Sequence, residues 1–260
     1  MTSPGLDELV SVLVRAAEVA HAAVDAPDVR RSRDDVRADH AVDDAVVPLL
    51  AGCGLTVYSE ESGRSTPPGT PSRHAVILDP LDGSRNFRLG VPWYAFSACL
   101  LRDGRPAAAV VRNLATGATT LGIRGGGAWA LTPDGRRRIA VTRVGSLARA
   151  HVLYSGYPSV PVPGVTRRNL GASSLDLCAV AAGDFHVSLD LSRSGTESWD
   201  HAAGLLIAAE AGAHIRARRT AAGRFGGGVF ARRHLAIASS AVLLAEATAW
   251  ADRAGPAPRG

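Results

Sequence analysis

The segment Leu78–Phe87, LDPLDGSRNF, places two aspartates around a proline directly after the apolar run HAVIL. A short apolar run bounded by turn residues is typical of a buried strand, so we expect Asp79 at the carboxyl end of that strand. Two carboxylates about 4 Å apart repel by about 4 kcal/mol at an effective dielectric constant of about 20. Acids that converge at a strand end therefore either share a proton or bind a cation.

Three acidic features could supply ligands to one cation: Asp79 with Asp82, the pair Glu60 and Glu61, and Asp200 in SWDHAAG. Each also has an ordinary structural interpretation. DPLDG can be a plain turn, adjacent glutamates are typical of a solvated turn, and an aspartate suits the N-cap of the apolar helix that follows. Together they favour a cation, and the all-oxygen ligand set favours a hard ion such as Mg²⁺ over zinc.

The turn after Asp82 adds the means to bind an anion. Gly83 supplies a turn whose backbone N–H groups can point at an anion, and Ser84 adds a hydroxyl. A hard dication beside an anion-binding turn is the equipment of phosphoryl chemistry. The residues therefore indicate a metal-dependent reaction on a phosphate.

Length and cysteine usage limit the class of protein. A chain of 260 residues can bury roughly three quarters of its unfolded surface, which suits one large domain or two closely packed halves. Cys53, Cys99 and Cys178 are odd in number and lack CxxC spacing, so we expect small buried thiols in a reducing, cytoplasmic compartment. No stretch reaches about 18 uninterrupted apolar residues, so we expect no membrane span.

The chain carries a net charge of +5, and all of its 29 basic residues are arginine. The clusters Arg136–Arg138 and Arg216–Arg219 lack the interleaved aromatic residues of a nucleic-acid stacking surface. We therefore expect solvated loops at both clusters and do not expect nucleic acid to be a partner. The competing hypothesis is a non-catalytic protein that uses its basic surface to bind nucleic acid or another protein.

The order of the expected elements divides the chain near residue 140. The first part should hold an amphipathic N-terminal helix, a second helix that ends at Gly52 or Gly54, a loop at Ser62–Ser72 and a largely antiparallel sheet. Strands and helices alternate in the second part, with expected helices near Leu175–Ala182 and His201–Ala211. We predict an α+β half at residues 1–140 that carries the metal-binding loop, and an α/β half at residues 141–260 that completes the active site.

These residues resemble the inositol monophosphatase family of Mg²⁺-dependent, lithium-sensitive phosphatases. That family has a Gly-Glu-Glu turn, an Asp-Pro-Ile-Asp-Gly-Thr-x-Asn-Phe loop and a distal Trp-Asp-x-Ala-Ala-Gly helix start. The corresponding segments here are Ser59–Ser62, Asp79–Phe87 and Trp199–Gly204, and secondary similarities lie at Gly125–Trp129 and Arg168–Cys178. The resemblance implies the sugar-phosphatase fold, an α/β layered αβαβα sandwich, and a small phosphate monoester as substrate.

The resemblance also implies a role for each matching residue. Two or three Mg²⁺ ions would be held by Glu60, Asp79, the carbonyl of Leu81, Asp82 and Asp200. Asp39 and Ser84, with Glu60, would orient and deprotonate the attacking water, and are the candidate catalytic residues. Gly83 and Ser84 would bind the phosphate. Relatives of this kind are commonly dimeric, so a homodimer is expected.

The chain departs from the family where the substrate would bind. Arg193 stands seven residues before Asp200, at the position of a family acid that binds substrate hydroxyls. Asp190 or Glu197 could replace that acid, while an arginine there could pair with a second phosphate or a carboxylate. The candidate substrate-binding residues are Arg168, Ser173, Asp190 and Arg193.

We therefore predict an Mg²⁺-dependent phosphomonoesterase that hydrolyses a small polyol, inositol or sugar phosphate with a metal-activated water. Histidinol phosphate and 3′-phosphoadenosine 5′-phosphate are the alternative substrates. Ser59 in place of glycine and Ser84 in place of threonine keep the turn and the hydroxyl, so we expect activity to survive both changes.

Overall fold

The computed structural model describes residues 5–67 and 73–254. It begins with three helices, α1 (Leu6–Asp25), α2 (Pro27–Ser32) and α3 (Asp35–Gly52). The predicted amphipathic helix is α1, and the second predicted helix is α3, which ends at Gly52. α3 starts before the apolar run because Asp34 caps it, accepting a hydrogen bond from Arg37 N, and its charged first turns face solvent.

Eight strands form the first sheet. They are β1 (Thr56–Ser59), β2 (Gly63–Ser65), β3 (His74–Asp82), β4 (Ala95–Arg102), β5 (Arg105–Asn113), β6 (Thr119–Ile123), β7 (Gly127–Thr132) and β8 (Gly135–Ile139). Their order is β2-β1-β3-β4-β5-β6-β7-β8, and every neighbouring pair is antiparallel except β1 with β3. The prediction of a largely antiparallel sheet is confirmed. The short helix α4 (Ser84–Leu89) directly follows β3.

The second sheet has five strands in the order β10-β9-β11-β13-β12. They are β9 (His151–Gly156), β10 (Thr166–Arg168), β11 (Val187–Leu191), β12 (His214–Ala221) and β13 (Arg232–Ala238). The helices of this part are α5 (Ser173–Ala182), α6 (Ser198–Glu210) and α7 (Ala241–Ala254), with short 3₁₀ turns η1 (Leu147–Arg149) and η2 (Gly228–Phe230).

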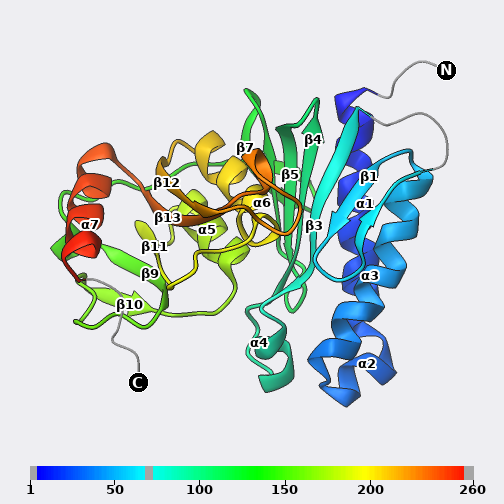
Figure 1. Cartoon of the computed structure of the whole chain (residues 1–260), viewed down its shortest axis with the longest axis horizontal. Helices are drawn as coiled ribbons and strands as arrows, with labels where there is room; N and C mark the ends of the chain where they lie inside the picture. The colour runs from blue at the N-terminus through cyan, green and yellow to red at the C-terminus, as the bar shows by residue number, and fades with distance from the viewer. Residues whose placement is uncertain (1–4, 68–72, 255–260) are drawn as a thin grey trace.

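The elements stack in five layers (Figure 1). One apolar cluster joins α1 and α3 to the first sheet, a second places α5 and α6 between the sheets, and a third packs α7 on the outer face of the second sheet. This arrangement confirms the predicted αβαβα sandwich. The division into two domains near residue 140 stays a prediction. Within residues 5–67 and 73–254, none of the helices combines the length and apolar character needed to cross a membrane.

Three local predictions were wrong. Part of the expected loop Ser62–Ser72 is strand β2, and residues 68–72 lie outside the described parts of the chain. Both arginine clusters belong to strands, β8 and β12, and not to loops. These strands lie at sheet edges, where charged side chains can remain solvated. Cys53 is exposed, because it caps the end of α3, whereas Cys99 and Cys178 are buried as expected.

The last residue of α6 fastens this central helix to the first sheet. The Glu210 carboxylate accepts hydrogen bonds from Gly125 N at 2.9 Å, in the turn between β6 and β7, and from Gly127 N at 3.0 Å, at the start of β7. Hydrogen bonds to a charged group contribute about 1.5–3 kcal/mol each when they are not fully solvated. Glu210 therefore fixes the carboxyl end of the helix whose amino end carries Asp200.

We expect Glu210→Ala to lower the free energy of unfolding by about 2 kcal/mol, because two backbone donors lose their charged acceptor. Urea denaturation followed by circular dichroism measures this change. Glu18→Ala, at an exposed position of α1, is the matched control and should change stability by less than about 0.5 kcal/mol. Equal effects of the two substitutions would show that the Glu210 anchor is unimportant.

Candidate metal centre

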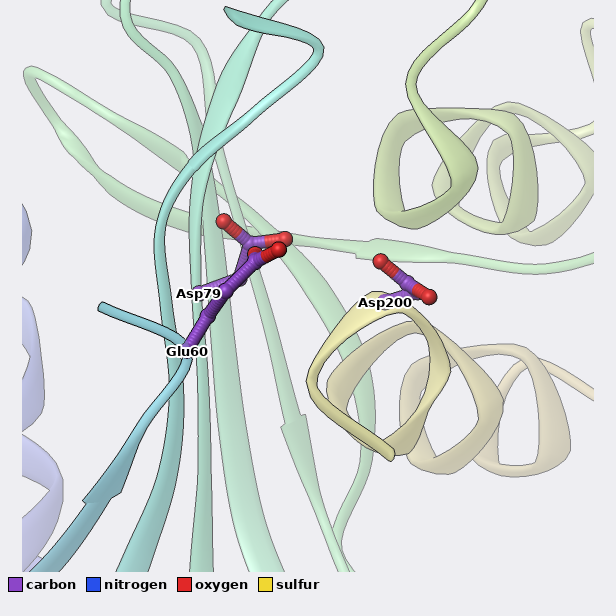
Figure 2. A group of neighbouring side chains, drawn as sticks. All are labelled: Glu60, Asp79 and Asp200. Carbon is purple, nitrogen blue, oxygen red and sulfur yellow. The ribbon is translucent and has the colours of Figure 1, made fainter. Parts of the chain in front are cut away.

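Three carboxylates converge between the two sheets. Glu60, Asp79 and Asp200 each offer an oxygen, and these oxygens lie within 4.8 Å of one another. Figure 2 shows Glu60 and Asp79 side by side, with Asp200 facing them from the start of α6. Asp79 is buried, while Glu60 and Asp200 are half-buried. The structure thus brings together the three sequence features that were predicted to share a cation.

Parallel pairing of β1 with β3 aligns the first two acids. Ser59 lies opposite Leu78 in this pairing, so Glu60, the first residue after β1, comes to lie beside Asp79. β3 continues to Asp82, so the prediction that Asp79 ends this strand was wrong by three residues. Glu60 N donates to Leu78 O at 3.1 Å, which holds the turn after β1 against β3. Asp79 begins an irregularity in the pairing of β3 with β4, and its Oδ1 accepts a hydrogen bond from Leu81 N at 3.0 Å. Both backbones are therefore fixed where the side chains meet.

Asp200 is held by the capping of α6. Glu197 N donates to Asp200 Oδ2 at 2.7 Å, and the Glu197 side chain accepts a hydrogen bond from the backbone of Asp200 in return. This reciprocal arrangement corrects the simple N-cap interpretation: Glu197 is the N-cap, and Asp200 occupies the third helical position. Because one oxygen of Asp200 is used in the cap, its orientation toward the other two acids is fixed.

Burial and mutual repulsion raise the pKa of all three acids. Burial is the larger cause in each case, followed by neighbouring carboxylates. The pKa of Glu60 rises to about 7, despite a hydrogen bond from the Trp199 side chain that lowers it, and the pKa values of Asp79 and Asp200 lie well above their usual range. A divalent cation would relieve this repulsion. The oxygen-only donor set fits a hard ion such as Mg²⁺.

Asp82 points elsewhere and is not a member of this group of three. Its carboxylate accepts hydrogen bonds from Ser173 N at 3.3 Å, Ser174 N at 2.7 Å and Ser174 Oγ at 2.6 Å. Asp82 therefore binds the start of α5. These bonds lower its pKa, but burial outweighs them and raises it to about 6.

The turn after Asp82 is tightly enclosed. Gly83 has φ +83°, a left-handed conformation, and a Cβ at this position would lie 2.9 Å from both Ala172 Cβ and Trp93 O. Asn86, in α4, donates its side-chain amide to Trp93 O and to Leu170 O, both at 2.7 Å. Glycine is thus required at position 83 by conformation and by space.

The other two predicted catalytic residues, Asp39 and Ser84, lie on α3 and α4. Asp39, on α3, has a pKa raised to about 8 by burial and then by Glu61 and Glu60, which places it near the turn after β1. Ser84 is half-buried at the first position of α4. The pairing of Asp39 with the Ser84 hydroxyl stays a prediction.

The hydrogen bonds and ion pairs of the candidate substrate residues Arg168 and Asp190 are to different partners and do not join these two residues to one another. Arg168 is exposed and donates to the carbonyl of its neighbour Arg167 at 2.9 Å. Asp190 accepts from Ser155 Oγ at 3.1 Å, and lies 3.4 Å from His234 Nδ1. Arg193 is exposed in the loop after β11. Their roles, and that of Ser173, stay predictions.

Sequence reasoning missed two buried acids near the site. Asp43 accepts a hydrogen bond from Ser59 Oγ, which fixes the end of β1 next to Glu60. Asp176 accepts a hydrogen bond from Trp93 Nε1 at 2.9 Å, and burial raises its pKa to about 8. Asp43 and Asp176 occupy buried positions among the apolar residues of α3 and α5. A charged residue on the apolar side of a helix was the sequence signal that could have identified them.

Known proteins resemble this chain over most of its length. Residues 13–253 match the inositol monophosphatase family. An inositol-1-monophosphatase from Mesorhizobium japonicum is 35% identical over 193 residues, covering 69% of this chain and 70% of that protein. A histidinol-phosphatase from Mycobacterium tuberculosis is 33% identical over 213 residues, covering 76% of this chain and 79% of that protein. The solved structure of Mycobacterium tuberculosis SuhB superposes with a TM-score of 0.74 at 28% identity, covering 95% of this chain and 96% of that one.

The fold, the acidic group and these similarities define the class of protein: a phosphatase that hydrolyses phosphate monoesters. The chain belongs to the inositol monophosphatase family. That family is metal-dependent, and Glu60, Asp79 and Asp200 form an acidic group that could bind the metal. The predicted family, fold class and reaction are confirmed.

The raised pKa values predict how the metal-free protein responds to pH. The folded protein keeps protons on Glu60, Asp79 and Asp200 that the unfolded chain releases near pH 4, so the stability gained by binding them is complete below about pH 4. The contribution of Glu60 is lost as the pH rises through about 7, and those of Asp79 and Asp200 are lost as the pH rises through their own raised pKa values. We expect the thermal midpoint of the metal-free protein to decrease as the pH is raised from about 5 to about 8. At about pH 8, added Mg²⁺ should raise the midpoint again. A change of 1 kcal/mol corresponds to about 2–4 °C.

The variant Asp79→Asn separates the two effects in the same thermal measurement. Without metal at about pH 8 it should melt higher than the unmodified protein, because one repelling charge is gone, and Mg²⁺ should stabilise it little. Asp134→Asn, in the exposed turn between β7 and β8, should behave like the unmodified protein. An equal response of Asp79→Asn to Mg²⁺ would show that the ion binds elsewhere.

Proposed function

We propose that this protein is an Mg²⁺-dependent phosphomonoesterase that acts on an inositol, polyol or sugar phosphate. The observation that carries the proposal is the convergence of Glu60, Asp79 and Asp200 within 4.8 Å. Bound Mg²⁺ would neutralise the phosphate, favour ionisation of a water and stabilise the leaving oxygen. The number of ions, two or three, follows the family resemblance and is part of the proposal.

Further ligands in the proposal are the carbonyl of Leu81 and the carboxylate of Asp82. An ionised carboxylate offers about four acceptor sites, and Asp82 uses three of them for Ser173 and Ser174. One site therefore remains for an ion. In this proposal Asp82 joins the metal site to the start of α5.

The residues around the acids are assigned to proton transfer and phosphate binding. Asp39 and Glu60 are the carboxylates assigned to accept a proton from the attacking water, and their charges interact across the turn after β1. Ser84 would orient that water through its hydroxyl. Gly83 and Ser84 would direct backbone N–H groups at the phosphate.

Several phosphate monoesters fit the proposal. Inositol phosphate is suggested by the Mesorhizobium relative, and histidinol phosphate by the Mycobacterium relative. A fructose-1,6-bisphosphatase from Pyrococcus furiosus is 34% identical over 180 residues, which makes a sugar bisphosphate a further candidate. 3′-Phosphoadenosine 5′-phosphate remains an alternative because exposed Arg193 could pair with a second anionic group.

Phosphate release from these substrates, measured with and without Mg²⁺, tests the proposed activity. We expect Mg²⁺-dependent turnover of at least one substrate, and a loss of at least about 100-fold in Asp200→Asn, because one metal-ligating charge is removed. The exposed control Asp134→Asn should retain full activity. No release from any substrate, or full activity of Asp200→Asn, would contradict the proposal.

We also infer a cytoplasmic homodimer. The unpaired, buried Cys99 and Cys178 support a reducing compartment. Tyr157 is 84% exposed and Val165 63% exposed in the connection from β9 to β10, and we place the contact with a second subunit at this connection. Multi-angle light scattering should give a mass twice that of the 26.9 kDa chain. The double variant Tyr157→Ser, Val165→Ser should shift the measured mass down toward that of a single chain. A monomer at every concentration would exclude the dimer.

A further inference from the structure

The connection from β12 to β13 extends from the second sheet toward β3 of the first, as the orange segment of Figure 1 shows. We call residues 223–226, Gly-Arg-Phe-Gly, the GRFG turn. Two backbone hydrogen bonds close it, from Gly223 N to Gly226 O at 2.8 Å and from Gly226 N to Gly223 O at 3.0 Å. The closed turn leaves Arg224 and Phe225 at its tip.

The base of the GRFG turn is fixed to the start of α6. Arg224 N lies 3.4 Å from Glu197 Oε2, and the other oxygen of Glu197 pairs with Arg232 Nε at 3.4 Å. A Cβ at Gly223 would lie 2.7 Å from Glu197 Oε2, so the turn packs directly against this carboxylate. Glu197 is also the residue whose backbone and side chain orient Asp200.

The side chain of Arg224 contacts the opposite side of the acidic group. Its Nη1 donates to the carbonyl oxygen of Glu60, although the two residues are separated by 164 positions in the sequence. Its Nη2 lies 3.6 Å from where a Cβ on Gly63 would be. The guanidinium therefore covers the turn that carries Glu60.

The ring of Phe225 contacts neighbours of both acids. Its centroid lies 5.2 Å from that of Tyr58 and 5.7 Å from that of Trp199, with edge-to-face geometry in both pairs. Tyr58 precedes Glu60 by two residues, and Trp199 directly precedes Asp200. One ring is thus packed between the two segments that deliver these carboxylates.

Glu60 and Asp200 repel each other and come from segments far apart in the chain, so their separation must be imposed by other contacts. We propose that Arg224 and Phe225 are positioning residues that hold Glu60 and Asp200 at the separation a divalent cation requires. Arg224 acts through the backbone of Glu60, and Phe225 acts through Tyr58 and Trp199. The inference rests on the metal site of the proposed function.

Titration of the full chain with Mn²⁺ alone, with free Mn²⁺ measured by electron paramagnetic resonance, tests this role without using activity. Arg224→Ala should weaken Mn²⁺ binding by about tenfold, as is typical when a residue that supports a metal ligand is lost. Arg64→Ala is the matched control: it removes an exposed arginine of β2 that stacks on Tyr58, with its Cζ 5.7 Å from the ring centroid. This control removes the same charge without the contact to Glu60, so Mn²⁺ binding should not weaken.

The direction of the change in Mn²⁺ affinity distinguishes a positioning role of Arg224 from a purely electrostatic one. Removal of a positive charge near a cation site should tighten cation binding by Coulomb's law alone, whereas loss of positioning should weaken it. Tighter or unchanged Mn²⁺ binding in Arg224→Ala would overturn the proposal. Absence of Mn²⁺ binding by the unmodified protein would instead contradict the metal site itself.

Phe225→Leu tests the second positioning residue with a side chain that keeps the region apolar. We expect this variant to bind Mn²⁺ more weakly than the unmodified protein, while its thermal midpoint without metal stays unchanged. Its kcat should recover when the Mg²⁺ concentration is high. The same recovery is expected for Arg224→Ala, because the acids themselves remain. A lowered kcat that no Mg²⁺ concentration restores, together with normal Mn²⁺ binding in both variants, would exclude positioning as their role.

Discussion

The repulsion among Glu60, Asp79 and Asp200 is the constraint around which this fold is arranged. Buried carboxylates this close are stable only if protons or a cation offset their charge. The backbone must also keep them from moving apart, and each acid has its own restraint: strand pairing for Glu60, an irregular strand end for Asp79 and helix capping for Asp200. These restraints fix the main chain, so little flexibility remains for the charges to separate.

Close packing of α6 carries this constraint between the two halves of the chain. A Cβ at Gly204 would lie 2.7 Å from Leu177 Cβ, and a Cβ at Gly122 would lie 3.0 Å from Ile207 Cα. Small residues at these positions therefore allow α6 to approach both α5 and the first sheet. With Glu210 fixed at its other end, the helix delivers Asp200 to the acids of the first sheet as a rigid element.

The sequence predicted those features whose cause is local. The apolar run before Asp79 and the turn residues after it are contiguous, so the strand and its acids could be inferred directly. Asp200 could be assigned only by its combination with the other acids and by resemblance. The bonds of Ser174 to Asp82 and of Arg224 to Glu60 join segments 92 and 164 residues apart, and no local pattern signals such contacts. The arginine-rich strands were missed because edge strands tolerate exposed charge.

The placement of Asp190 separates the chemistry of the reaction from the choice of substrate. Ser155 and Ser192 both donate to its Oδ1, whereas its buried Oδ2 lies 3.4 Å from His234 Nδ1 and accepts no hydrogen bond within the described parts of the chain. Because Oδ2 is buried, a substrate hydroxyl could reach it only if neighbouring side chains moved, so Asp190 is poorly placed to replace the family acid. Arg193 is exposed in the segment after β11, at the position where the family resemblance implies an acid. The acidic group thus carries the proposed metal chemistry, while the proposed choice of substrate would depend on the separate segment after β11.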